Sequence, residues 1–154
     1  MDKFTEYKER LKTHSEYILA LRKDIHRIIN QRELSSVMND TKWLELQREV
    51  ESLPFYPPLI VKCLTDLDDY PIGELVDAPR YLGDWSSFWQ EGLPPFINIE
   101  WIRVRPRHGK YRGRLVPDEI LDETEEFLSI MDKLSIPYEE DSEDSGTFII
   151  YGYR

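Results

Sequence analysis

The stretch RVRPRHGKYRGR, residues 103–114, holds the side chains best suited to bind an anion. Arginine presents a planar fork of N–H donors that fits phosphate and carboxylate oxygens, and it stacks on rings such as Trp101. Alternate residues of a strand share one face, so a strand over 97–105 would present Ile99, Trp101, Arg103 and Arg105 together. The predicted anion-binding set is Arg103, Arg105, Arg107, Lys110, Arg112 and Arg114.

The acidic residues that follow give these bases a second interpretation. Asp118 comes four residues after Arg114, and acids recur as far as Glu126. Because an acidic domain repels phosphate, we favour pairing of the arginines within the chain, or with an acidic face of a second copy. The sequence leaves both interpretations open, and nucleic acid is the less favoured partner.

Carboxylates form a second candidate site, one suited to a basic protein. They lie in the irregular stretch 65–96, next to bulky rings, and in the run 139–144. Acidic surfaces steer the association of basic partners. The predicted partner-binding residues are Asp66, Asp68, Asp69, Asp84, Trp85, Glu139, Glu140, Asp141, Glu143 and Asp144.

The sequence contains no motif typical of catalysis. HExxH, paired CxxC, P-loop, GxGxxG and GxSxG patterns are all missing, and the histidines at 14, 26 and 108 are scattered. Cys63 is the single cysteine, so neither an internal disulfide nor a cysteine-rich zinc site can form. We expect a buried, unreactive thiol there. The chain is therefore predicted to be non-enzymatic, with no cofactor and no metal.

Composition narrows the class of protein. A chain of 154 residues, 40% hydrophobic and 12% aromatic, has enough apolar surface for one compact domain and room for one appended element. With 20 Lys and Arg against 30 Asp and Glu, its net charge of -10 argues against a general nucleic-acid binder. The single cysteine and the lack of a long apolar run predict a cytoplasmic protein without membrane contact.

Residues 1–34 are predicted to form one long amphipathic helix. Its apolar residues follow a seven-residue repeat, at Phe4, Tyr7, Leu11, Ile18, Leu21, Ile25 and Ile28. A strict seam would make this helix an oligomerisation arm, giving a homodimer through residues 4–28. Tyr17 and Ile29 widen the stripe, which would suit a helix lying on the chain's own sheet. Both alternatives are retained.

Residues 39–154 are predicted to form an α+β domain. A helix begins at the capping residues 39–41 and ends near Leu53, and the apolar residues 59–64 predict a buried strand. Residues 97–116 are predicted as a β-hairpin with its turn at PRHGK, Pro117 opens a further helix, and TFIIYGY forms a terminal strand. This order predicts a small antiparallel sheet of about four strands packed with two helices.

Three motifs of this domain resemble those of a family of small acidic bacterial proteins of unknown function. They are NDTKW (39–43), PPFINIEWIRV (94–104) and GTFIIYGY (146–153). The resemblance covers about residues 39–154 and implies an α+β fold with no assigned activity. Small proteins of this kind often act as immunity partners of secreted toxins.

Two functional hypotheses follow. The leading one is a protein-binding protein of the immunity type, whose acidic patches neutralise a basic toxin. The alternative is an anion- or nucleic-acid-binding module that uses the basic hairpin 103–114.

Overall fold

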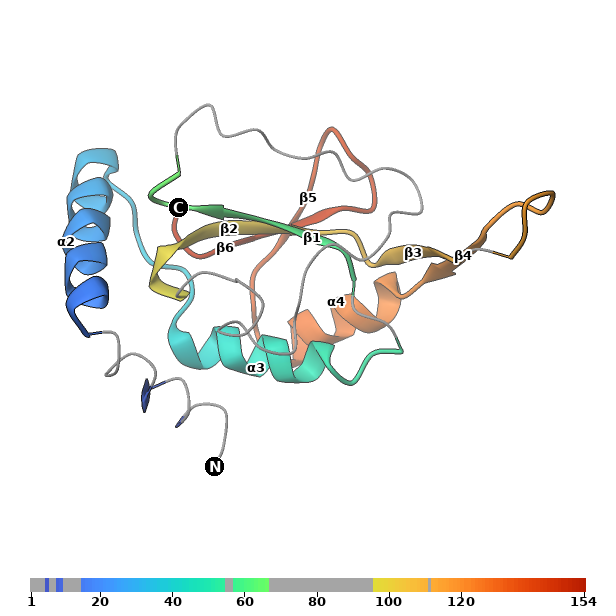
Figure 1. Ribbon diagram of the computed structural model, residues 1–154, viewed down its shortest axis with the longest axis horizontal. Coiled ribbons are helices and arrows are strands. Elements are labelled where there is room, and N and C mark those ends of the chain that lie inside the picture. Colours follow the sequence, from blue (N-terminus) through green and yellow to red (C-terminus); the bar gives the residue numbers. More distant parts are fainter. Residues whose placement is uncertain (1–4, 6–7, 10–14, 55–56, 67–95, 111) are drawn as a thin grey trace.

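The computed structural model of the chain describes residues 5, 8–9, 15–54, 57–66, 96–110 and 112–154 (Figure 1). Within these ranges the α-helices are α2 (Ser15–Arg32), α3 (Asp40–Val50) and α4 (Thr124–Lys133). A four-stranded antiparallel sheet has the strand order β1 (Leu59–Cys63), β2 (Ile99–Val104), β6 (Phe148–Tyr151) and β5 (Glu139–Glu140). A 3-10 turn, η1 (Phe96–Asn98), leads into β2. The predicted α+β class with about four strands is confirmed.

The helices α3 and α4 cover one face of this sheet (Figure 1). Their apolar residues meet those of β2 and β6 in a core that includes Leu46, Val50, Val104, Phe127 and Ile150, all without exposed surface. The helix α3 starts where predicted, because the Asn39 side chain accepts a hydrogen bond from the Lys42 N–H (2.8 Å). The side chains of β2 and β6 that do not enter this core point to the opposite face of the sheet.

The helix α2 packs at one end of the sheet (Figure 1). Leu21 and Ile25 form a small cluster with Leu64, separate from the main core. The segment after α2 pairs with the end of the chain, since the Val37 N–H donates to the Gly152 carbonyl (2.8 Å). The C-terminal half of α2 thus lies on the chain's own domain. Positions 4, 7 and 11 of the predicted repeat lie outside the described residues, so the homodimer through residues 4–28 stays a prediction.

The strand β2 departs from strict alternation at its start. Its ladder with β1 pairs Lys62 with Trp101 but Cys63 with Ile99, which marks a bulge. Ile99 consequently lies in the core, and the prediction that it shares a face with Trp101 is wrong. The bulge leaves Glu100 buried, where Lys62 and Arg32 pair with its two carboxylate oxygens. Arg32 thereby ties α2 to the sheet.

A two-stranded ribbon extends away from the body of the molecule (Figure 1). It pairs β3 (Arg107–Lys110) with β4 (Glu119–Asp122), and we call residues 107–122 the arm. The predicted hairpin with a turn at PRHGK is therefore wrong: PRHGK contains a strand, and the connecting loop comes later. Pro106 lacks an N–H for the ladder with β6 and separates β2 from the arm.

The predicted helix start at Pro117 is also wrong. The residues after Pro117 form β4, and α4 begins at Thr124. Asp122 marks this boundary, because its Oδ1 accepts hydrogen bonds from the Thr124 N–H (2.9 Å) and hydroxyl (2.6 Å). These hydrogen bonds, the Thr124 side-chain bond foremost, hold the pKa of Asp122 below its ordinary value.

Candidate functional site

The face of the sheet away from α3 and α4 carries a pocket that we call the sheet-face pocket. Register places Trp101 opposite Tyr151 and Arg103 opposite Ile149, so these side chains point to the same side of neighbouring strands. The pocket measures about 420 Å³. It is lined by Trp101, Arg103, Asp141, Glu143, Ile149 and Tyr151.

One wall of this pocket comes from residues 139–146, which we call the acidic loop. Arg103 reaches it from β2, and its Nη2 lies 2.7 Å from Asp141 Oδ2 and 3.9 Å from Asp144 Oδ2. The side chains of Arg103 and Asp141 are 16% and 14% exposed, so this ion pair is largely shielded from water. The basic strand and the acidic run, predicted as two separate sites, lie against each other here.

Arg105 makes a deeper contact with the same loop. Its Nη2 pairs with Asp144 Oδ1, and its Nε donates to Thr147 Oγ1 (3.2 Å), while the Thr147 hydroxyl donates to Asp144 Oδ2 (2.7 Å). The Arg105 side chain is only 3% exposed. Burial would raise the pKa of Asp144, but the Thr147 hydrogen bond and the guanidinium groups of Arg105 and Arg103 hold that pKa below its ordinary value.

The other acids of the loop differ in their interaction partners. Glu140 Oε1 accepts from the Gly146 N–H (3.0 Å) and so closes the loop. Glu139 lies 2.5 Å from Arg154 Nη1 and accepts from the Tyr151 hydroxyl (3.5 Å). Burial, followed by the charge of Glu139, raises the pKa of Tyr151. Glu143 is exposed at the rim of the pocket, and no cation is paired with its carboxylate among the described residues.

The remaining bases of the predicted anion site lie along the arm. Arg107, at its base, donates to the Ser145 carbonyl (3.4 Å). Arg112 donates to the Pro117 carbonyl (3.1 Å), and Arg114 is exposed in the loop between the strands. Lys110 lies at the end of β3. The structure therefore divides the basic stretch, with Arg103 and Arg105 in ion pairs on the body and Arg112 and Arg114 on the arm.

Of the acidic residues predicted in the stretch 65–96, the structure describes Asp66. Asp66 follows β1, where its Oδ2 accepts from the Cys63 N–H (2.7 Å) and ends the strand. Burial, followed by the charge of Asp66, raises the pKa of the Cys63 thiol to about 12, so the thiol stays protonated at neutral pH. Asp68, Asp69, Asp84 and Trp85 lie outside the described residues.

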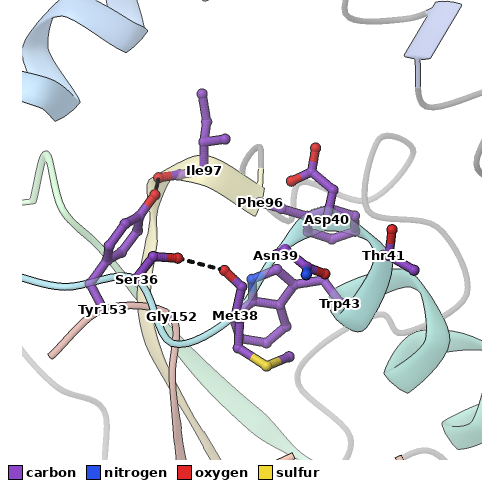
Figure 2. A pocket seen from close by; sticks show the side chains of 10 residues that line it. All are labelled: Ser36, Met38, Asn39, Asp40, Thr41, Trp43, Phe96, Ile97, Gly152 and Tyr153. Carbon is purple, nitrogen blue, oxygen red and sulfur yellow. Dashed lines mark hydrogen bonds between the residues drawn. The ribbon is translucent and has the colours of Figure 1, made fainter.

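A second pocket of about 480 Å³ lies at the start of α3 (Figure 2). Residues of all three motifs that carry the family resemblance meet there. The rings of Trp43 and Phe96 stack with centroids 6.3 Å apart, and the Tyr153 hydroxyl donates to the Ile97 carbonyl (2.7 Å). A Cβ at Gly152 would lie 2.1 Å from the Ile99 carbonyl oxygen, so glycine is required. These contacts hold α3, η1 and the end of the chain together.

Sequence reasoning did not select Ile149 and Tyr151. The alternation within TFIIYGY indicates that they share one face of a strand, but only the pairing of β2 with β6 shows that this face is also that of Trp101 and Arg103. Within the described parts of the chain, no group of His, Cys, Asp and Glu could hold a metal ion. Of the helices that the structure describes, none is both long and apolar enough to cross a membrane.

Comparison with known proteins identifies a family. The chain belongs to DUF6678, a family of unknown function whose model matches residues 25–154. The match begins inside α2 and includes Ile25, which packs on the domain, whereas the three motifs alone cover about residues 39–154. Among curated proteins and among solved structures, none matches the chain.

Proposed function

We propose that this member of the DUF6678 family is a non-enzymatic binding protein that recognises a basic protein through the sheet-face pocket and the acidic loop. In its sharpest form the proposal is an immunity-type protein that neutralises a basic toxin. The observation that carries it is the placing of Trp101 and Tyr151 beside a loop of five carboxylates, on the sheet face away from the helices.

The composition of this surface suits protein recognition. Tryptophan, tyrosine and arginine are the residues that dominate binding energy in protein interfaces, and Trp101, Tyr151 and Arg103 line one pocket. Their side chains are partly buried already, and ion pairs hold Arg103 in place. Binding to a preordered surface loses less conformational entropy than binding to a mobile one.

The charge of this surface favours a cationic partner. The loop carboxylates Glu139, Glu140, Asp141, Glu143 and Asp144 meet four guanidinium groups, those of Arg103, Arg105, Arg107 and Arg154, which leaves a local net charge of -1. The whole chain, at -10, adds a long-range attraction for basic proteins. Glu143, exposed at the rim, is the carboxylate best placed to meet a lysine or arginine of the partner.

A second candidate function rests on the arm. Arg112 and Arg114 are exposed there, away from the acidic loop, and could contact phosphate. Arg103 and Arg105 are engaged with Asp141 and Asp144, so this alternative now relies on a smaller basic set than the sequence suggested. Binding of this kind would weaken steeply with added salt and would be lost in the double variant Arg112→Ala with Arg114→Ala.

The test is an affinity capture with a matched pair of charge reversals. The full-length chain, Glu143→Lys and Asp132→Lys are immobilised and exposed at low salt to a nuclease-treated lysate of the source organism. Asp132 is exposed on α4, on the other side of the sheet, so its reversal changes the net charge equally without touching the pocket. We expect a basic protein to be retained by the wild type and by Asp132→Lys, and to be lost with Glu143→Lys.

A protein captured in this way is then tested for neutralisation. Co-expression of the wild-type chain should protect cells from the captured protein, and Trp101→Ala should protect them less, because it removes a central aromatic contact. Equal capture by both charge-reversed variants would show that the sheet-face pocket is not the recognition surface. Nucleic acid recovered from an untreated lysate, and lost in the arginine double variant, would favour the second candidate function.

A further inference from the structure

The loop of the arm exposes an unusual amount of apolar surface. Leu115 is 95% exposed, and Val116 and Ile120 expose about half of their surface. Arg114 lies next to Leu115, and within the described residues no acid is paired with its guanidinium. A contiguous apolar and cationic tip on a projecting ribbon is typical of a contact surface rather than of a solvated loop.

The chemistry of the arm tip complements the sheet-face pocket. The tip offers Leu115 and Val116 beside Arg114, and the pocket offers two aromatic rings and Ile149 beside Asp141 and Glu143. Arg114 on the tip and Glu143 at the pocket rim are opposite in charge, and both surfaces have apolar side chains, which is the usual anatomy of a protein interface. A phosphate surface would satisfy the arginines but would leave Leu115 and Val116 without an apolar contact.

We infer that the chain binds a second copy of itself by placing the tip of one arm, Arg114 to Val116, in the sheet-face pocket of the other. The partner copy would thereby supply the basic and apolar side chains that this pocket is proposed to recognise. The inference concerns the arm and goes beyond the proposed function, although both use the same pocket. Self-association then competes with binding of a basic protein.

The position of the arm is compatible with a reciprocal exchange. Arg107, at the base of the arm, contacts Ser145 of the acidic loop, so the arm leaves the body close to the loop that borders the pocket. At about 3.3 Å per residue, the ribbon from Arg107 to Leu115 can extend at most about 26 Å. A twofold axis beside the acidic loop would let each arm reach the other copy and would bury two equal contacts.

The experiment is sedimentation-velocity analysis of the purified full-length chain across a concentration series. We expect a monomer–dimer equilibrium in the wild type. Leu115→Asp should weaken the dimer about ten-fold or more, the factor expected for losing a buried leucine contact and burying a carboxylate in its place. Leu19→Asp is the matched control, because Leu19 is also an exposed leucine but lies on α2.

A charge exchange provides the specific evidence. Arg114→Glu should weaken the dimer, and adding Glu143→Lys should restore part of the lost affinity, which a merely destabilised arm would not show. A wild-type chain that is monomeric throughout the series would overturn the inference, as would a dimer that Leu19→Asp dissociates and Leu115→Asp leaves intact. No basic partner is present in this experiment, so its failure leaves the proposed function standing, and failed capture from a lysate leaves the dimer standing.

Discussion

The two ends of the stretch 103–114 carry the same residue type in opposite environments. Arg105 is almost fully buried and paired with Asp144, whereas Arg114 lies exposed on the arm. The difference arises around Pro106, which lies between the end of β2 at Val104 and the start of the arm at Arg107. Arg103 and Arg105, before this point, pair with the acidic loop, and Arg112 and Arg114 are exposed on the arm. Arg107, at the base of the arm, still contacts the loop. A basic stretch in a sequence can thus provide both an internal counter-charge and exposed basic side chains.

Replacing Arg105, the buried arginine, should have the largest effect on stability. Arg105→Ala leaves the carboxylate of Asp144 and the hydroxyl of Thr147 without their guanidinium partner in a largely buried position. Breaking such a pair costs about 3 kcal/mol of unfolding free energy. Urea unfolding at neutral pH would measure the loss. Arg114→Ala is the matched control, and as an exposed substitution it should change stability by less than about 0.5 kcal/mol.

Equal losses of unfolding free energy for Arg105→Ala and Arg114→Ala would mean that the buried arginine stabilises the fold no more than the exposed one. A further variant, Arg105→Met, distinguishes lost packing from lost charge, because methionine retains much of the side-chain volume. We expect Arg105→Met to remain destabilised, since it still leaves the Asp144 carboxylate without its closest cation.

A smaller effect is expected for the coupling between Arg103 and Asp141. Their side chains are shielded but still reach solvent, so the pair should contribute about 1 kcal/mol, between the values of exposed and buried ion pairs. A double-mutant cycle with Arg103→Ala and Asp141→Ala, followed by urea unfolding, measures this coupling. The same cycle on Arg114 and Asp132, which lie on the arm and on α4, should give no coupling. Additive losses for Arg103 and Asp141 would show that their contact does not stabilise the fold.

The sequence predicts the fold better than it predicts the site. Helix caps, apolar strands and alternation depend on local chemistry, and Asn39, the stretch 59–63 and TFIIYGY behave as that chemistry requires. The arm was misplaced because Gly109 and Pro117 are ordinary turn and helix-start residues, while the pairing of β3 with β4 depends on contacts across the ribbon. Local signals alone do not show that the helix begins at Thr124, where Asp122 accepts a hydrogen bond from the Thr124 N–H, and not at Pro117.

The candidate site was predicted only as separate parts. Composition predicts both the basic set and the acidic run, and the charge of the chain favours internal pairing of the arginines. The expected partners were the acids from Asp118 to Glu126, but Arg103 and Arg105 pair with Asp141 and Asp144, which are distant in sequence. Strand order β1-β2-β6-β5 brings these segments together, and no periodicity in the sequence specifies that order.

The smallest expected effect is a change in the pH dependence of stability. The pKa of Asp144 in the folded chain lies below its ordinary value of 3.8, so the folded state binds this proton less readily than the unfolded state. Its stabilising contribution is therefore complete well above pH 3.8 and is lost as the pH falls through the lower folded pKa. Asp144→Asn should unfold at lower urea concentration at pH 7 but should lose less further stability on acidification. Some acid sensitivity should remain, because the pKa of Asp122 is lowered as well. Urea unfolding from pH 7 down to about pH 2.5 checks this difference, with Arg114→Ala expected to follow the wild type. If the wild type and Asp144→Asn lost stability in parallel on acidification, the ion pairs of the acidic loop would not set the response to acid. The buried end of the basic stretch would then differ from the exposed end in packing alone.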